Sequence, residues 1–530
     1  QEPADLDVEQ IDLVIALGDL AENRLRPGVV RGESLAHVPQ RWHEVNLIRW
    51  QGGLMKPVGG WERLLANPLA SVPRQGHVWF DSNGNKWRAY LCDAHIFAQN
   101  KSGQLFNLTP GDFVDANSTA ARGYSSGDYG KNDFGMDDED RGSGLGAADP
   151  DRPTRFSLDN WNAELVFSSS ADGRVYIWNP DTPNVAPHTA EGVPPLVQSV
   201  IVTDEHHLMT FGGQGTRNRV AWSDQDNRAG WDFARVDGQA GYYDLENAGR
   251  IYCGIKIPGA VLCFTATGVW IGRYIGSPYF YGWNRLAEGC APVSPHAIAV
   301  AGQRAWWMGT RSWWKFEGGI VAPVTSTLGL EPFETMFKDA APRRVTAGFN
   351  GLYPEVWFFY PEEQGLSAVE TENNRYVIYN FEEGWWADGW MHRSFFAFSP
   401  HDRQPMAGDD MGFVYSHEIG YKAEGAPRGR MVYAQSSAIS FSDGGRNFAV
   451  HQGQIDSPEG PDSVTLTIRG NYNRGGEYYL MHDKLAPRPD GFVDFHFQAT
   501  DFTMRIEGME DKPWALGAMV INDPKMRSKK

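Results

Sequence analysis

Short runs of alternating apolar and polar residues fill most of the chain from about residue 76 onward. Examples are HVWF, KWRAYLC, RVYIWN, SVIVTD, GVWIGRY and EVWFFYP, which are separated by Gly, Asn, Asp or Pro. Alternation with a period of two is typical of half-buried strands, and turn residues at such intervals separate one strand from the next. No run keeps a period of 3.6 residues, so we expect little helix. The pattern predicts an all-β protein.

Tryptophans recur at an even interval within these runs. Five of them are separated by 44, 48, 44 and 43 residues: Trp178, Trp222, Trp270, Trp314 and Trp357. An interval of about 40–50 residues suits a four-stranded propeller blade. The chain holds 20 Trp, so some even spacing arises by chance, and the surroundings of Trp357 differ from those of Trp178. We expect a large β-propeller-like domain over residues 61–425, with stacked sandwiches as the alternative.

The two ends of the chain depart from this pattern. The first sixty residues are irregular, and we assign residues 1–60 as an N-terminal arm or docking segment in which residues 11–25 form a short amphipathic helix. The glycine pairs Gly52–Gly53 and Gly59–Gly60 predict turns between short strands. The segments SVTLTIRG, FVDFHFQA and FTMRIEG read as strands again, so we expect a sandwich-like C-terminal β domain over residues 426–530.

One internal stretch, residues 111–155, is rich in Gly and Asp and nearly free of aliphatic side chains. It is too long for a turn within a blade and too polar to form a core of its own. We expect a loop insertion on the surface of the propeller-like domain.

Composition limits the kinds of function. The net charge of −18 argues against a protein that grips nucleic acid, because tight binding needs Lys and Arg against phosphates. The longest apolar runs fall short of a membrane span, so we expect no transmembrane helix. Four cysteines, Cys92, Cys253, Cys263 and Cys290, are too few for a disulfide scaffold at this length, and we expect buried thiols.

The common catalytic signatures are absent from the sequence. It contains no phosphate-binding GxxxxGK[ST], no zinc-binding HExxH, no CxxC and no GxSxG. The glycines at 142, 144 and 146 follow no predicted strand and open no predicted helix, so they do not indicate a dinucleotide loop. We therefore expect no enzyme, no catalytic residue, no cofactor and no metal.

Three polar clusters need separate mention. Asp224, Asp226 and Asp232 offer the oxygen ligands that calcium prefers, but without the spacing of a calcium loop. The pairs His206–His207 and His417–Glu418 stand at predicted strand edges, where buried or turn-capping histidine is the simplest role. The acids of residues 137–140 read as a solvated loop rather than as a glycosidase pair, which needs two carboxylates facing one cleft.

Several segments carry a resemblance to one family. They are NLIRWQGGLMKPVGGWERL, LFNLTPGD, GYSSGDYG, FSLDNWNAELVFSSSADGRVYIWNP, VAWSDQDNRAGWDF, YIGSPYFYGWNRLAEGCAPVSPHAIAVAGQRAWWMG, NNRYVIYNFEEGWWADGWMHRS and FVYSHEIGY. No single segment is diagnostic, but their order along the chain resembles the tail nozzle proteins of short-tailed bacteriophages (podoviruses), also called packaged-DNA stabilisation proteins. One departure is Asn162, where the family usually has Gly; Asn also tolerates turn conformations.

The resemblance implies a structural protein of the virion tail. Several copies, typically six, would form a ring below the head–tail adaptor, extend the DNA channel, help retain packaged DNA and guide its ejection. The implied partners are other copies of the chain, the adaptor ring, tail fibres or spikes, a plug or needle, and double-stranded DNA that passes without sequence-specific binding or membrane insertion. An acidic channel wall would repel DNA and let it slide.

Within this interpretation the loop insertion supplies the candidate site residues. Six acids in it are candidates for a gate or lumen element or for an inter-subunit loop: Asp128, Asp133, Asp137, Asp138, Glu139 and Asp140. A solvent-facing insertion is the alternative. Two other function classes remain open: a receptor- or glycan-binding tail component, and a tail enzyme that degrades envelope polysaccharide.

Overall fold

The chain divides into two compact units, one of residues 59–426 and one of residues 1–58 together with 427–530. The computed structural model describes residues 25–31, 41–116, 154–213, 216–338, 340–363, 372–441, 447–472, 476–509, 511–517, 519–521 and 525–526. The six candidate acids of the loop insertion lie outside the described residues, as does nearly all of the helix expected over residues 11–25.

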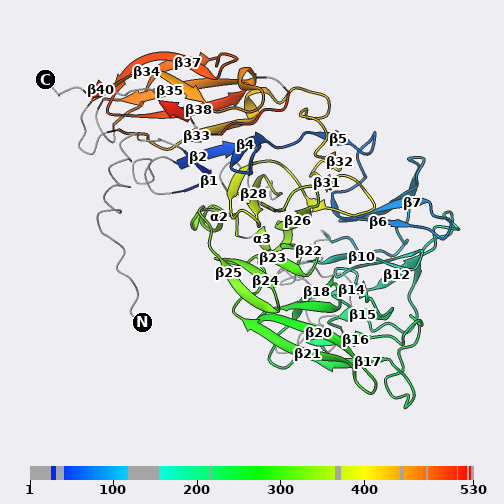
Figure 1. Ribbon diagram of the computed structural model, residues 1–530. Coiled ribbons are helices and arrows are strands. Elements are labelled where there is room, and N and C mark those ends of the chain that lie inside the picture. The colour runs from blue at the N-terminus through cyan, green and yellow to red at the C-terminus, as the bar shows by residue number, and fades with distance from the viewer. Residues whose placement is uncertain are drawn as a thin grey trace, which may run out of the picture. The chain divides into compact units, whose positions relative to one another are not determined.

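The larger unit is a β-propeller whose described residues form seven four-stranded sheets (Figure 1). Blade one contains β6 (Pro73–Phe80), β7 (Lys86–Cys92), β8 (Ile96–Gln99) and β9 (Leu105–Asn107), and blade two β10 (Phe156–Trp161), β11 (Glu164–Ser169), β12 (Val175–Trp178) and β13 (His188–Thr189). Blade three contains β14 (Ser199–Val202), β15 (Leu208–Phe211), β16 (Arg219–Trp222) and β17 (Gly241–Asp244), and blade four β18 (Ile251–Ile257), β19 (Ala260–Thr265), β20 (Gly268–Gly276) and β21 (Phe280–Glu288).

The remaining blades follow in chain order. Blade five contains β22 (Ile298–Ala301), β23 (Arg304–Met308), β24 (Trp313–Glu317) and β25 (Ile320–Val324), and blade six β26 (Thr346–Asn350), β27 (Glu355–Tyr360), β28 (Arg375–Asn380) and β29 (Trp386–Trp390). The short helices α2 (Glu331–Glu334) and α3 (Ala341–Arg344) connect these two. Blade seven contains β30 (Phe395–Ala397), β31 (Met406–Gly408), β32 (Val414–His417) and β5 (Trp61–Arg63).

Blade seven closes the ring with a strand from the start of the unit. In Figure 1 the blue β5 lies with the yellow β31 and β32, and the register pairs Trp61 with His417. The glycine pair of this segment is needed for close approach: a Cβ on Gly60 would collide with the backbone of Lys422, and one on Gly59 with Glu418. The expected turn at Gly59–Gly60 is therefore the place where the two ends of the propeller pack together.

The core of the propeller lies between neighbouring blades. One buried cluster joins blades one and two, others join two to three, three to four and four to five, and another joins blade one to blade seven. The recurring Trp178, Trp222, Trp270 and Trp314 all lie on third strands, β12, β16, β20 and β24. Trp357 lies on β27, the second strand of its blade, opposite Ile378. The spacing of the first four tryptophans therefore marks the same strand in successive blades. Trp357 does not belong to this repeat, because it lies on the second strand of its blade.

The propeller has two sides, which we define by the direction of the first strands. First strands lie side by side around the axis, as β6, β10, β14 and β18 do. We call the side where these strands begin the entry side; it also carries the turns between second and third strands. The exit side carries the turns between first and second strands and between third and fourth strands, because consecutive strands pair antiparallel.

The smaller unit combines both ends of the chain. Its six-stranded sheet contains β1 (Arg26–Val29), β2 (Arg41–Asn46), β33 (Tyr433–Ser436), β38 (Asp501–Gly508), β35 (Val464–Asn471) and β36 (Tyr479–Leu485), in that order. A second sheet contains β37 (Phe492–Ala499), β34 (Phe448–Ile455), β39 (Met519–Ile521) and β40 (Lys525–Met526). The hairpin of β3 (Ile48–Gln51) and β4 (Leu54–Pro57) turns at Gly52 and Gly53, whose φ angles are 60° and 73°.

This arrangement differs from the expected division at the ends. Residues 1–60 and 426–530 were expected as an arm and a separate domain, but β2 pairs with β33, so the two segments share one sheet. The physical reason is burial: Trp42 and Val45 of β2 are only 4% and 2% exposed, and a β2 without its partner strand would leave this apolar face in water. Two short 3₁₀ helices belong to the same unit: η3 (Gly429–Met431) precedes β33, and η4 (Pro461–Ser463) lies between β34 and β35.

Candidate functional site

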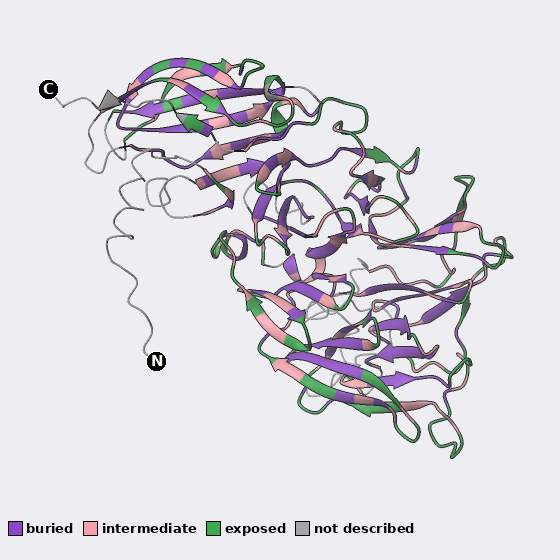
Figure 2. Cartoon of the chain, viewed as in Figure 1, coloured by how far each residue is buried: buried purple, intermediate pink, exposed green. Residues whose placement is uncertain are grey.

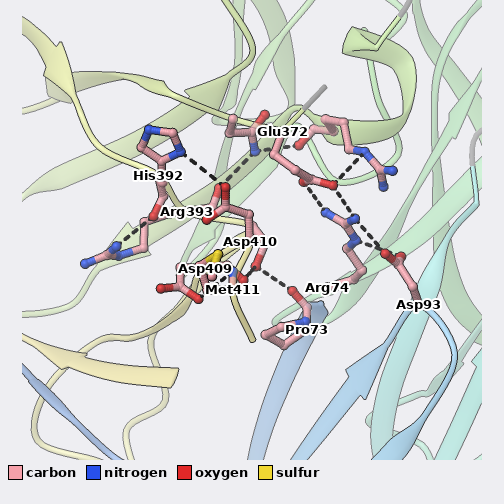
Figure 3. A network of polar contacts seen from close by, with 12 residues as sticks. Pro73, Arg74, Asp93, Glu372, His392, Arg393, Asp409, Asp410 and Met411 are labelled. Carbon is pink, nitrogen blue, oxygen red and sulfur yellow. Dashed lines mark hydrogen bonds and ion pairs between the residues drawn. The ribbon is translucent and has the colours of Figure 1, made fainter. Parts of the chain in front are cut away.

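The entry side holds a buried charge cluster between blades one and six. Arg74, the second residue of β6, is 4% exposed and donates from Nε and Nη2 to the Asp93 carboxylate at 2.7 Å. The same guanidinium donates from Nη1 and Nη2 to Glu372, also at 2.7 Å. Arg344 at the end of α3 lies 3.2 Å from Glu372. Figure 3 shows Arg74 between the two carboxylates. We call Arg74, Asp93, Arg344 and Glu372 the seam cluster.

Electrostatics hold the seam cluster in its charged form. Burial opposes charge on Glu372, but the Arg74 guanidinium outweighs it and lowers the pKa of Glu372 to about 2. Burial likewise opposes charge on Arg74, but Glu372 and Asp93 raise its pKa above the ordinary value. The pKa of Arg344 is lowered, first by burial and then by Arg74. A cluster whose members satisfy one another has little left to offer a substrate.

A second arginine fixes the closing strand. Arg393, between β29 and β30, is 5% exposed, and its guanidinium carbon lies 5.2 Å from the Trp61 ring and 4.5 Å from the Tyr415 ring. Its Nε donates to His417 Nε2 at 2.8 Å, so that nitrogen carries no proton. Burial lowers the pKa of Arg393 to about 10. Arg393 therefore ties β5 to β32 through ring contacts rather than through an ion pair.

One histidine–carboxylate pair adjoins this region. His392 Nδ1 lies 3.4 Å from Asp410 Oδ2, as Figure 3 shows. The contact raises the pKa of His392 and lowers the pKa of Asp410. The His392 side chain is 58% exposed, so the pair contributes little to folding.

The exit side holds a shallow depression between blades three and four that is open to solvent and has room for about one water molecule. The turn after β14 supplies Asp204 and Glu205, and the turn between β20 and β21 is flanked by Tyr274 and Tyr281. We call it the exit-side pocket; its full lining is Thr203, Asp204, Glu205, Lys256, Ala260, Val261, Gly272, Tyr274 and Tyr281. Tyr281 donates its hydroxyl proton to Glu205 Oε2 at 3.0 Å and lies 2.9 Å from Thr203 Oγ1, which joins blade four to blade three.

A buried histidine packs behind the two tyrosines. His207 is fully buried, and its ring centre lies 6.0 Å from that of Tyr274 and 5.5 Å from that of Tyr281. His207 Nδ1 donates to the Ser223 carbonyl at 2.8 Å, which leaves Nε2 as an acceptor, and this atom has no hydrogen-bond partner among the described residues. Burial lowers the pKa of His207, so the ring is neutral.

The hairpin beside the pocket exposes apolar side chains. β20 and β21 are each nine residues long, whereas the corresponding strands of blade three have four. Near their turn, Tyr279 is 74% exposed, Ile275 59% and Tyr274 36%. Figure 2 shows that the first strands of the blades are largely buried and that exposed residues gather on outer strands and turns. An exposed group of large apolar side chains on a projecting turn is a common mark of a contact surface.

The polar clusters singled out in the sequence have ordinary structural roles. Asp224 accepts from the backbone of Gln239 and Ala240, and the carboxylates of Asp226 and Asp232 bond elsewhere, to His206 and to the Ala234 backbone. Among the described residues, no group of three or more His, Cys, Asp or Glu side chains is placed to hold a metal.

The expectations for histidine, cysteine and Asn162 are confirmed. His207 and His417 are buried, while His206 and Glu418 have φ angles of 67° and 61° in turns. Asn162 has a φ of 54°, a conformation that Gly also adopts. All four cysteines are buried free thiols: Cys92, Cys253, Cys263 and Cys290. Sequence reasoning missed Arg74, because no local pattern links it to Glu372, 298 positions further along the chain. It also missed Arg393 and the exit-side pocket, whose contacts form only when neighbouring strands and blades pack together.

Comparisons with known proteins bear on the fold alone. No family model and no curated protein matches the chain. A streptogramin B lyase structure matches with a TM-score of 0.39 and 11% identity, covering 67% of this chain and 97% of the lyase. A catalytically inactive virginiamycin B lyase from Staphylococcus aureus with quinupristin gives 0.38 and 9%, covering 66% and 97%. Chaetomium thermophilum Raptor gives 0.40 and 10%, covering 68% of this chain and 30% of Raptor.

In the described part of the chain, no helix has the length and apolar character needed to cross a membrane.

Proposed function

We propose that the chain is a structural subunit of the tail nozzle of a short-tailed bacteriophage and has no catalytic role. In this proposal several copies, six in the simplest case, form a ring below the head–tail adaptor, and the ring extends the DNA channel of the virion. The assignment is suggested by the order, along the chain, of the sequence segments that resemble this family. The propeller supplies a rigid body, and the second β unit, built from both chain ends, supplies a separate module for attachment.

The observation that carries the proposal is the use of buried charge in the propeller. The seam cluster and Arg393 are buried and hydrogen-bonded to groups of other strands and blades. Such groups stiffen a ring, whereas a catalytic acid or base needs a protonation state that changes during the reaction.

The test is the location of the chain on intact phage particles. Gold-labelled antibody against the chain, viewed by negative stain, is expected to mark the short tail just below the neck. Label at the tips of lateral fibres would contradict the nozzle and favour a receptor-binding component. Purified chain is also expected to leave host polysaccharide intact; release of oligosaccharide would instead establish the tail-enzyme alternative.

A further inference from the structure

Two exposed histidines of the smaller unit point their ring nitrogens at each other. His451 lies on β34 and His496 on the neighbouring β37 (Figure 1), and their Nδ1 atoms are 2.7 Å apart. Their rings are inclined by 28°, with centres 4.5 Å apart. We call these two residues the histidine pair. The other histidines of the described residues have no such nitrogen-to-nitrogen contact with a second imidazole.

The backbone holds the histidine pair in place. β34 and β37 run antiparallel and pair on both sides of it, Val450 with Phe497 and Gln452 with Asp494, and the register shift between these pairs lies at the two histidines. On the opposite face of β37, Phe495 and Phe497 are each only 4% exposed. Since successive side chains of a strand alternate between its faces, the burial of these rings fixes His496 on the solvent side.

A third histidine supports the outer edge of β37. His482 of β36 places Nε2 3.0 Å from the His496 carbonyl oxygen and 3.1 Å from the His496 backbone nitrogen. Its side chain therefore occupies hydrogen-bonding groups that an edge strand would otherwise leave to water. His496 is thus held by β34 on one side and by His482 on the other, which leaves its imidazole as the part that can move.

The separation of the two nitrogens suits a shared metal ion. At 2.7 Å the two imidazoles share one proton, which one Nδ1 donates to the other. A metal about 2.0 Å from two nitrogens in neighbouring corners of a square would set them about 2.8 Å apart, and tetrahedral geometry about 3.3 Å. The ion would take the place of the shared proton, which passes to water, while each ring turns about its broad χ2 torsion.

The surroundings determine which ions fit. The neighbouring Asp494 accepts from Gln452 Nε2 at 2.7 Å and forms an ion pair with Arg488, so its charge is already balanced. In the part of the chain that the structure describes, no third His, Cys, Asp or Glu side chain is placed to complete a metal site. Two imidazole nitrogens and water form a ligand set that favours copper, nickel and zinc over calcium and magnesium, which prefer oxygen.

We propose that the histidine pair is a surface site for one divalent transition-metal ion, with water in the remaining coordination positions. The square arrangement and the general order of metal affinities make Cu²⁺ the tightest ligand, ahead of Ni²⁺ and Zn²⁺. The inference does not rest on the nozzle proposal, since it uses only residues of the smaller unit.

The test is a titration of Cu²⁺ into the full chain in a buffer that does not bind metals, followed by calorimetry and electron paramagnetic resonance. The parent chain is expected to bind Cu²⁺ through nitrogen ligands, more tightly than Zn²⁺ and without competition from Ca²⁺. His451→Gln and His496→Gln should each weaken Cu²⁺ binding by at least about tenfold, because one arm of a two-ligand chelate is lost. Both side chains are exposed, so the melting temperature should stay that of the parent protein.

A matched control makes the result specific. His188→Gln with His401→Gln removes two exposed imidazoles from the propeller and is expected to leave Cu²⁺ affinity unchanged. An affinity for Cu²⁺ that survives in both His451→Gln and His496→Gln would overturn the proposal. Equal weakening in the propeller control, or a bound Cu²⁺ whose spectrum shows oxygen ligands alone, would overturn it as well.

Discussion

The seam cluster and the exit-side pocket both gather charged residues on the propeller, but they use charge in opposite ways. At the seam, Arg74 is buried and binds two carboxylates, each through two hydrogen bonds. At the pocket, Asp204 and Glu205 keep contact with water and have single donors. Burial with mutual pairing makes the first region part of the fold, whereas the carboxylates of the second stay in contact with solvent and are not needed to neutralise a buried cation.

The difference between the two regions would be disproved most clearly if the propeller stayed equally stable without Arg74, the cation at the centre of the seam cluster. Arg74→Met should destabilise the propeller by about 3–5 kcal/mol, because two carboxylates would be left unpaired inside the protein. Urea denaturation measured by tryptophan fluorescence reports the change. The control is Arg219→Met, which removes a partly exposed pair with Asp244 and should cost less than about 1 kcal/mol. Equal losses in the two variants would remove the distinction between structural and surface charge.

Ring closure gives the next largest effect. Gly60→Ala places a Cβ against the Lys422 backbone and should cost about 1–3 kcal/mol, because backbone atoms cannot move aside cheaply. Gly111→Ala is the matched control, since a Cβ there meets nothing within 4 Å. Melting temperatures of the two variants give the comparison. An unchanged Gly60→Ala protein would show that closure does not depend on this contact.

Acid should act on His207 and on Glu372 at different pH values. The lowered pKa of His207 means that its contribution to stability is complete above about pH 6.5 and is lost as the pH falls below it. The limit is about 1.4 kcal/mol per pH unit. The pKa of Glu372 is lowered from 4.5 to about 2, so the seam loses stability only as the pH falls from about 4.5 towards 2.

Denaturation curves of the parent protein and a His207 variant, collected between pH 7 and pH 5, isolate this contribution from those of His77 and His296, whose pKa values burial also lowers. His207→Asn keeps a donor for the Ser223 carbonyl but removes the titrating ring, and it should flatten the dependence of unfolding free energy on pH in this window. A slope equal to that of the parent protein would place the acid-sensitive group elsewhere.

The smallest effect concerns the hydrogen bonds that join blades three and four. Tyr281→Phe removes the hydroxyl shared by Thr203 and Glu205 and should cost about 1 kcal/mol. Tyr433→Phe, in the other unit, removes the hydroxyl of a less deeply buried tyrosine that donates to Glu44 and should cost less. Thermal unfolding measures both, and a larger loss for Tyr433→Phe would reverse the expected order.

The sequence predicted the propeller because its signal is local and repeated. Alternating runs mark each strand, and Trp178, Trp222, Trp270 and Trp314 mark the same strand in four blades. The same reasoning could not place β5 or β2, because each pairs with a strand more than 350 residues away. It missed the seam cluster for the same reason: Arg74 and Glu372 come from blades one and six, and no spacing rule links them.

The exit-side pocket escaped prediction for a different reason. Its acids, Asp204 and Glu205, look like ordinary turn residues, and Tyr281 looks like one more aromatic residue of a strand. Only the packing of blade four on blade three brings them together. The candidate acids of residues 128–140 stay a prediction, since they lie outside the described residues.

The strand order of blade seven has a consequence for synthesis on the ribosome. β5 is made before the other strands of the propeller but finds its partner only when β32 has emerged, after all the other blades. β2 waits longer still, for β33. Both early strands must therefore wait for a late partner strand while the blades between them are made. The propeller can close only after β32 has been made, and the smaller unit only after β33 and the strands that follow it.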